Sequence, residues 1–292
     1  MSLEQGIHDG VPMADYIADA ISPEPSLSTG VAQALIERTP LHAWHEHPRL
    51  GGAKGDQSPR ADLGSAVHTS ILGGAPIEYV NEVVKLSGPD KGLAFVPTDW
   101  ATKSAQEQRD AIYARGAIPM LPHQRATIEA ATANAKAVLA AYGDGKAEQT
   151  LLCQYRGVWL RGRADYLTGD GQWDIDVKTV DNADPASWVK RVVFAGGLDI
   201  QAAIRCIGHE EITGRTRGML WLLVEIEPPY AACVVAPGPA MLELAQRKVE
   251  LSADRWRKCL AEQKWPGYRT DIHWADLPSY VEYDFEARRG AA

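Results

Sequence analysis

Two absences narrow the classes of protein to which this chain can belong. The four cysteines, Cys153, Cys206, Cys233 and Cys259, are scattered and form no C-x-x-C pair, a pattern typical of reduced and mostly buried thiols. No run of about 18 apolar residues occurs, and the N-terminus lacks a basic region followed by an apolar core. The sequence therefore predicts neither a membrane helix nor a secretory signal, and we expect a cytoplasmic protein.

The chain also has no excess of positive charge. Its 30 Lys and Arg residues stand against 38 Asp and Glu residues, which gives a net charge of −8. This balance argues against a protein that coats nucleic acid along its whole surface, but it is compatible with a local basic groove. The 292 residues, 45% of them hydrophobic, suffice for one large α/β domain or two small ones.

The stretch from Tyr155 to Val180 predicts a β-hairpin, because two runs rich in β-branched and aromatic residues flank the turn formers at 169–171. Successive side chains of a strand point to opposite faces, so Ile175 and Val177 share one face of the second strand. The charged faces hold, on the first strand, Arg161, Arg163 and Asp165 and, on the second, Asp174, Asp176 and Lys178. Burying such a face is costly unless the charges bind something, and a divalent cation with a phosphate is the obvious ligand.

The spacing of these charges resembles a known signature. Asp165, ten intervening residues and then Asp176-Val177-Lys178 are similar to the PD-(D/E)XK nuclease motif, in which two acids hold Mg²⁺ or Mn²⁺ and the lysine acts on the attacking water. D-x-K also occurs by chance in many proteins, so the hairpin alone favours solvated surface charges. The order of further motifs along the chain decides between the two interpretations.

Upstream motifs resemble the RecE-type (exonuclease VIII-like) nucleases of the RecB-like branch. A short helix expected from Ser28 to Thr39 is followed by T-P-L-H at 39–42, similar to the Ser/Thr-Pro-x-His opening of that family. A helix expected at 62–72 carries Gly64-x-x-x-His68, which resembles a G-x-x-x-H motif whose histidine contributes to the metal site. A lone histidine on an apolar helix is more often a core residue, so this assignment depends on the motif order. The histidines at 42, 45 and 47 have no cysteine nearby and do not favour zinc.

Downstream motifs follow in the same order. Helices expected at 100–115 and 121–142 precede a strand in which Glu148 matches a family glutamate near the metal; an exposed strand-edge charge is the alternative. In the helix expected from 196 to 213, Gln201 and Arg205 lie four residues apart and hence on one face. They resemble the motif Q-x-x-x-Y with arginine in place of tyrosine. V-E-x-x-P-P-Y at 224–230 and W-P-G-Y at 265–268 complete the resemblance.

The resemblance implies an α/β fold with a PD-(D/E)XK restriction-endonuclease-like core, in which helices flank a central mixed β-sheet. It runs from about residue 26 to residue 268, which places the nuclease domain at 26–270. Residues 1–25 contain three prolines and little periodicity, so we expect a flexible arm there, and a tail at 271–292. The closely grouped cysteines that hold an iron–sulfur cluster in some RecB-like nucleases do not occur.

The site implied by the resemblance has three parts. Mg²⁺ or Mn²⁺ is expected on hard oxygen ligands with one histidine, a donor set that suits these cations. Its expected ligands are His68, Asp165, Asp176 and the carbonyl of Val177. Catalytic roles are expected for Lys178, Asp165, Asp176, Glu148 and Gln201. Arginines that hold phosphates bidentately are expected at Arg161, Arg163 and Arg205.

The implied activity is that of a metal-dependent exodeoxyribonuclease. It digests one strand of linear double-stranded DNA from the 5′ end and leaves 3′ overhangs for homologous recombination by strand annealing. The partners implied are DNA ends, further copies of the chain in a homo-oligomer and a single-strand annealing protein. The alternatives are a PD-(D/E)XK endonuclease or defence nuclease, and a non-catalytic DNA-binding accessory module.

Overall fold

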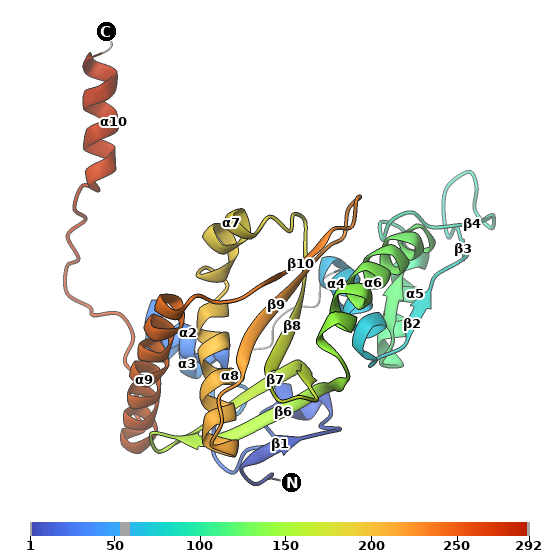
Figure 1. Ribbon diagram of the computed structural model, residues 1–292. Helices are drawn as coiled ribbons and strands as arrows, with labels where there is room; N and C mark the ends of the chain where they lie inside the picture. Colours follow the sequence, from blue (N-terminus) through green and yellow to red (C-terminus); the bar gives the residue numbers. More distant parts are fainter. Residues whose placement is uncertain (1, 53–58, 291–292) are drawn as a thin grey trace.

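A computed structural model describes residues 2–52 and 59–290 of the chain (Figure 1). Six strands form the central sheet in the order β1-β6-β7-β8-β9-β10, with β8 and β9 parallel and the other neighbours antiparallel. The strands are β1 (Gly6–His8), β6 (Gly145–Tyr155), β7 (Val158–Thr168), β8 (Trp173–Val180), β9 (Gly218–Glu225) and β10 (Ala232–Val235). The expected mixed sheet with flanking helices is confirmed.

The predicted hairpin is confirmed as β7 and β8. Asp170 stabilises its turn, because Oδ1 accepts hydrogen bonds from the Gln172 amide at 2.9 Å and the Thr168 hydroxyl at 2.6 Å. Gly171 has a φ of 79°, a left-handed conformation that glycine adopts without the penalty of a Cβ atom. The turn therefore sets which side chains of the two strands face each other.

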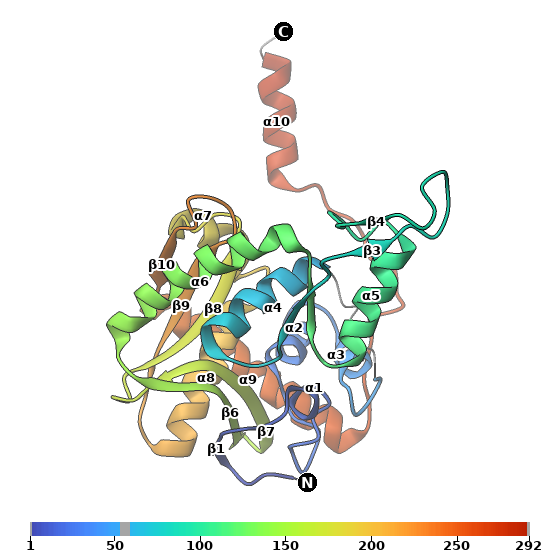
Figure 2. The same cartoon turned by 90° about the vertical axis from the view of Figure 1, so that its right-hand side faces the viewer.

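One face of the sheet is covered by α4 (Pro59–Leu72) and α6 (Arg125–Leu139) (Figure 2). Ile175 and Val177 of β8 are buried against these helices, as the alternation of the strand predicts. Leu220, Leu222 and Val224 of β9 belong to the same cluster. The helix α6 packs on them with a stripe of buried apolar side chains: Ile128, Ala131, Ala135 and Leu139. Such a stripe at three- and four-residue spacing is what a helix needs to pack on a sheet.

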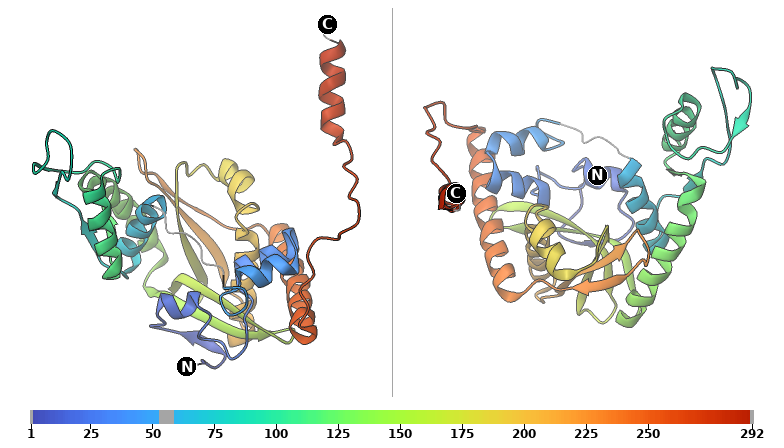
Figure 3. Two further views of the ribbon diagram at one scale, coloured as in Figure 1. Left: turned by 180° about the vertical axis from the view of Figure 1, so that it is seen from behind. Right: turned by 90° about the horizontal axis from the view of Figure 1, so that it is seen from above.

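The opposite face is covered by α8 (Leu198–Thr213) and α9 (Pro239–Glu262), with α2 (Thr29–Glu37) and α3 (Pro40–Glu46) beside them (Figure 3). Trp256 of α9 is fully buried there, and its ring N–H donates to the Pro25 carbonyl at 3.1 Å. Removing a buried tryptophan side chain costs about 3–5 kcal/mol. This helical layer is therefore part of the same folded unit as the sheet.

Further elements pack beside α4. They are α5 (Lys103–Ala114), a parallel pair β2 (Ile77–Tyr79) and β5 (Ile118–Met120), and an antiparallel pair β3 (Val83–Val84) and β4 (Ala94–Phe95). The short helix α7 (Pro185–Trp188) runs into the π-helical turn η3 (Val189–Val193). In the described part of the chain, no helix is long and apolar enough to cross a membrane.

The N-terminal residues differ from the expected flexible arm. β1 pairs with β6, and α1 (Met13–Ile17) follows it. The Asp19 side chain is buried and accepts hydrogen bonds from the amide and the hydroxyl of Ser26 at 2.9 and 2.5 Å. Paired strand edges and buried charges tie this segment to the sheet, which the low periodicity of the sequence does not reveal. At the other end, α10 (Ser279–Gly290) extends away from the domain and buries none of its residues.

Candidate active site

Two interruptions of the strand ladders bring acidic side chains together. β7 and β8 pair through Leu167 and Tyr166 and then separate before Asp165 and Asp176 would meet. In the gap, Asp165 Oδ2 accepts a hydrogen bond from the amide of Val177 at 2.8 Å. The carboxylate thus satisfies a backbone donor that has lost its strand partner.

The second interruption lies between β6 and β7. The ladder keeps one register on both sides but skips position 148, where Glu148 has a φ of 55°. A residue with a Cβ atom rarely adopts this left-handed conformation, which costs on the order of 1–3 kcal/mol. Strain of this kind persists where the surrounding structure enforces it and is often found at functional sites. The strained residue here, Glu148, lies beside Asp165.

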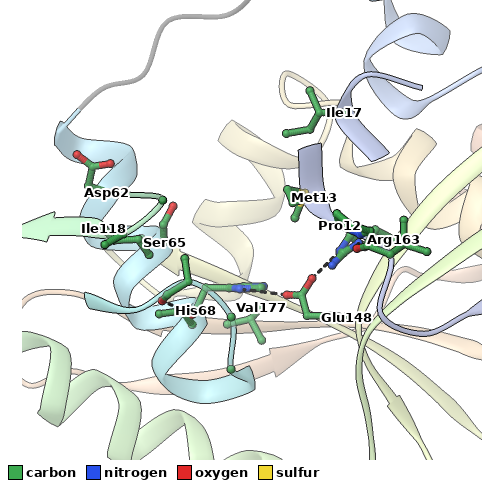
Figure 4. Close-up of a pocket in the computed structure, with 18 of the residues that line it drawn as sticks. Pro12, Met13, Ile17, Asp62, Ser65, His68, Ile118, Glu148, Arg163 and Val177 are labelled. Carbon is green, nitrogen blue, oxygen red and sulfur yellow. Dashed lines mark hydrogen bonds and ion pairs between the residues drawn. The ribbon is translucent and has the colours of Figure 1, made fainter. Parts of the chain in front are cut away.

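His68 of α4 lies beside both carboxylates, and Figure 4 shows its side chain next to Glu148. Its Nε2 lies 3.2 Å from Asp165 Oδ2 and its Nδ1 lies 3.5 Å from Glu148 Oε1. One ligand atom from each of the three residues lies within 4.8 Å of the other two. All three side chains are partly buried, so a cation here would be shielded yet reachable. One imidazole nitrogen and two carboxylate oxygens are suitable donors for Mg²⁺ or Mn²⁺, and the residues fit such an ion.

The protonation of this group follows from its charges. Burial lowers the pKa of His68, but the hydrogen bond to Asp165 and the charges of Asp165 and Glu148 outweigh it, and the pKa rises above 6.5. Burial raises the pKa of Asp165, but the hydrogen bond and charge of His68, with Lys178 nearby, lower it to about 2. A proton on His68 thus offsets part of the negative charge when no cation is bound. Metal binding would release that proton.

Asp176 lies next to this group but has different partners. Its Oδ1 accepts hydrogen bonds from Arg205 Nη1 at 2.8 Å and from Gln201 Nε2 at 3.3 Å, and its Oδ2 forms an ion pair with Lys178 Nζ. The predicted common face of Gln201 and Arg205 is thereby confirmed. Burial and the charge of Asp165 raise the pKa of Asp176, although Lys178 acts in the opposite direction. The structure places Asp176 beside the lysine rather than within the group of three potential ligands.

Arg205 is not available for DNA, contrary to the expectation from the sequence. Its side chain is 1% exposed and bridges two carboxylates: Nε donates to Asp174 Oδ2 at 2.9 Å, and Nη2 is paired with Asp174 Oδ1. His209 Nε2 lies 2.9 Å from the same Asp174. Burying these charges is tolerated because each is paired and hydrogen-bonded. Arg205 therefore binds Asp174 and Asp176 of β8 from within the core of the domain.

Arg161 is likewise an internal residue, and its expected role in phosphate binding is not supported. Its side chain is 5% exposed and pairs with Asp19 Oδ1 at 2.9 Å. Nη1 also donates to the hydroxyl and carbonyl of Ser26 at 2.6 and 3.1 Å. The N-terminal segment covers this end of the charged face of β7. Arg161 thus fastens that segment to the sheet.

Arg163 is the one of the three predicted arginines that reaches the site. It donates from Nε to Glu148 Oε2 at 2.5 Å and from Nη1 to the Val11 carbonyl at 2.9 Å. Glu148 therefore lies between Arg163 on one side and His68 on the other, as Figure 4 shows. The positively charged side chain of Arg163 and the potential metal ligand Glu148 thus lie side by side and form one wall of the site.

This wall belongs to a cavity of about 930 Å³. Its lining includes the side chains of His68, Glu148, Arg163 and Lys178. The lining also includes residues that sequence reasoning missed, contributed by α1, α4 and α5: Met13, Ile17, Asp62 and Tyr113. Tyr113 donates a hydrogen bond to Asp62, which lies in the first turn of α4. The N-terminal segment carries no motif, so only its pairing with β6 could reveal its place at the site.

Val177 contributes its amide to Asp165, while its side chain is buried in the core. Its expected role as a carbonyl ligand stays a prediction, as do the catalytic roles of Lys178, Asp165, Asp176, Glu148 and Gln201. The structure brings these residues together from four elements, β6, β7, β8 and α8, and His68 joins them from α4. Two acids and a lysine beside the separation of β7 and β8, in a mixed sheet flanked by helices, agree with the PD-(D/E)XK class expected from the sequence.

Comparison with known families agrees with this class. The family described as "PDDEXK-like domain of unknown function (DUF3799)" matches residues 52–276. Since this match covers most of the chain, the protein belongs to that family. A search of curated proteins finds no match.

One solved structure shares the fold at low sequence identity, and two further matches have TM-scores below 0.5. A crystal structure described as a "Putative exonuclease", from Eubacterium rectale, is 12% identical with a TM-score of 0.60, and the match covers 94% of this chain and 98% of that one. A phage-related exonuclease from Haemophilus somnus 129PT is 11% identical with a TM-score of 0.30, covering 58% and 92%. An alkaline exonuclease from Laribacter hongkongensis is 16% identical with a TM-score of 0.26, covering 56% and 88%. Only the first of these three structures supports the assignment of the fold.

Proposed function

We propose that this protein is a metal-dependent exodeoxyribonuclease that hydrolyses phosphodiester bonds of linear double-stranded DNA. The observation that carries the proposal is the meeting of His68, Glu148 and Asp165 within 4.8 Å, beside a cavity that His68, Glu148 and Lys178 line. Phosphodiester hydrolysis requires a nucleophilic water and neutralisation of phosphate charge. The residues gathered here are suited to both tasks.

His68, Glu148 and Asp165 would hold Mg²⁺ or Mn²⁺, and a bound cation supplies Lewis-acid charge to a phosphate and a lowered pKa to water. Lys178 is 28% exposed at the cavity, with its ammonium group beside Asp176. In this place it would orient the attacking water or take its proton. Asp176 would fix the ammonium group, because its own carboxylate is held by Arg205 and Gln201.

The choice of an exonuclease rests on resemblance and on a neighbour in structure. The motif order is that of RecE-type enzymes, and the Eubacterium rectale protein, which has the same fold, carries an exonuclease description. From the same resemblance we infer digestion from the 5′ end, 3′ single-stranded overhangs for recombination, a homo-oligomer and a single-strand annealing partner. An endonuclease and a non-catalytic binding module are the competing functions.

A comparison of DNA forms separates these functions. The protein would be incubated in Mg²⁺ or Mn²⁺ with linear duplex DNA and with covalently closed circles of the same sequence. An exonuclease degrades the linear form and spares the circle, whereas nicking of the circle would identify an endonuclease. Binding with both forms intact would identify a non-catalytic module. Duplexes labelled at the 5′ or the 3′ end of one strand would then test the proposed polarity.

A further inference from the structure

A second cavity of about 380 Å³ adjoins the candidate active site. Three residues line both cavities: Gly64, Lys178 and Thr179. Gly64 permits this junction, because a Cβ atom there would lie 2.8 Å from the Thr179 hydroxyl. The helix α4 therefore approaches the end of β8 closely, and the two cavities meet at Lys178. A strand bound in the first cavity has a direct continuation into the second.

The lining of the second cavity combines three kinds of chemistry. Lys178 and Arg191 supply positive charge, and Asn182 and Ser187 supply neutral hydrogen-bonding groups. An apolar surface is formed by Val180, Trp188, Val192 and Ile226. Asp181 also lines the cavity. Phosphate, sugar and base of a nucleotide need these three kinds of partner, and a volume of about 300–1,000 Å³ is usual for small-ligand sites.

Arg191 is presented to this cavity by the segment that follows β8. Asp184 caps the segment by accepting a hydrogen bond from the Ser187 amide at 2.8 Å. Arg191 lies in the π-helical turn η3, a local form that is frequent at functional sites. Its Nη2 donates to the Ser187 hydroxyl at 2.8 Å. The remaining guanidinium donors form a planar fork suited to a phosphate.

We propose that this second cavity binds the nucleotide adjoining the scissile phosphate, with Arg191 holding its phosphodiester group. The inference rests on the proposed nuclease function and extends it, since it assigns a strand path from the group of His68, Glu148 and Asp165 past Lys178 to Arg191. Neither α7 nor η3 contains a residue of the nuclease motifs. Arg161 and Arg205, which the sequence predicts to bind phosphate, are buried. We assign a phosphate-binding role to Arg191 instead.

The test measures DNA binding without cleavage. The full chain would be titrated in EDTA against a fluorescein-labelled duplex, and the dissociation constant followed by anisotropy over a range of salt concentrations. Arg191→Ala is expected to weaken binding by about tenfold, as loss of a hydrogen bond to a charged group does. It is also expected to reduce the magnitude of the slope of log K against log salt by about 1, which is the contribution of one phosphate contact.

Lys190→Ala is the matched control, because Lys190 is the adjacent exposed cation and does not line the cavity. It should change binding and slope less than Arg191→Ala does. Equal effects of the two substitutions would overturn the assignment of Arg191, since they would report only the general charge of the surface. Wild-type protein that neither binds nor cleaves DNA would instead reject the proposed function itself.

Discussion

Arg205 donates a hydrogen bond from Nη1 to Oδ1 of Asp176 over 2.8 Å, from within the core of the domain. The same guanidinium is paired with Asp174, so one arginine fixes two acids on the same face of β8. Where the resembled motif has a tyrosine, this chain has a buried cation. Burial alone lowers the pKa of Arg205, but the charges of Asp174 and Asp176 outweigh it and raise the pKa further above its ordinary value. The arginine thus stays charged and positions Asp176 for Lys178.

Arg205→Met is therefore expected to destabilise the fold severely. It removes the fully buried cation that Asp174 and Asp176 share and leaves them only His209 and Lys178 as charged partners; breaking such a buried group typically costs about 3–5 kcal/mol. Denaturant unfolding would measure this loss. Arg205→Met combined with Asp174→Asn should regain part of it, because one uncompensated charge is removed. Arg215→Met, at an exposed arginine beyond α8, is the control. A loss of less than about 1 kcal/mol for Arg205→Met would contradict the structural role.

His68→Ala tests the group of potential metal ligands. The imidazole is 27% exposed and faces a cavity, so its removal creates no closed apolar void and should change the melting temperature little. Affinity for Mn²⁺, measured by calorimetry, should fall by at least about tenfold, with a corresponding loss of hydrolysis. His123→Ala, at an exposed histidine remote from the cavity lining, should alter neither. A large drop in melting temperature with unchanged Mn²⁺ affinity would show that His68 is a packing residue.

The sequence predicted the hairpin, the helices and the order of the site residues, because each leaves a local pattern. Alternation placed Ile175 and Val177 in the core and the charges opposite, and the four-residue spacing placed Gln201 and Arg205 on one face. Local patterns do not tell whether a charged face meets water or another charged element. Arg161 meets Asp19, which lies more than a hundred residues earlier in the chain. Its burial therefore depends on a tertiary contact that no spacing reveals.

Glu148 shows the same limit at the site itself. A glutamate on a strand could be recognised, but its φ of 55° could not. That conformation depends on the neighbouring strand, on the ion pair with Arg163 and on the proximity of His68. Short strands and helices carry little periodic signal, so the sequence of the N-terminal segment predicts only a flexible arm. Its hydrogen bonds to β6 and its buried Asp19 place it at the wall of the cavity.

Lys178→Arg tests whether Lys178 takes part in proton transfer or only supplies charge. Arginine keeps the charge but does not readily lose a proton, and its planar fork cannot take the place of a compact ammonium group beside Asp176. The variant should bind DNA as wild type does and be nearly as inactive as Lys178→Ala, measured by single-turnover hydrolysis. Lys146→Arg, at an exposed position on β6, is the control. Recovery of most of the rate in Lys178→Arg would show that the lysine only holds a phosphate.

Asp19 predicts a pH dependence of stability that is separate from the metal site. Burial raises the pKa of Asp19, but the hydrogen bond with His47, the charge of Arg161 and the hydrogen bonds from Ser26 outweigh it, and the pKa falls below 3.8. The folded state therefore binds this proton less readily than the unfolded state. The resulting stabilisation is fully present well above pH 3.8 and is lost as the pH falls through the lower folded value.

Asp19→Asn should accordingly lower the free energy of unfolding near neutral pH, and the difference from wild type should shrink as the pH is reduced below about 4. Denaturant titrations at several pH values would measure it, with Asp15→Asn on the exposed side of α1 as the control. The same variant should weaken DNA hydrolysis with Mn²⁺ affinity intact, because Met13 and Ile17 of the loosened α1 line the cavity. A difference in stability that stays constant with pH, or a loss of Mn²⁺ affinity, would contradict this role of Asp19.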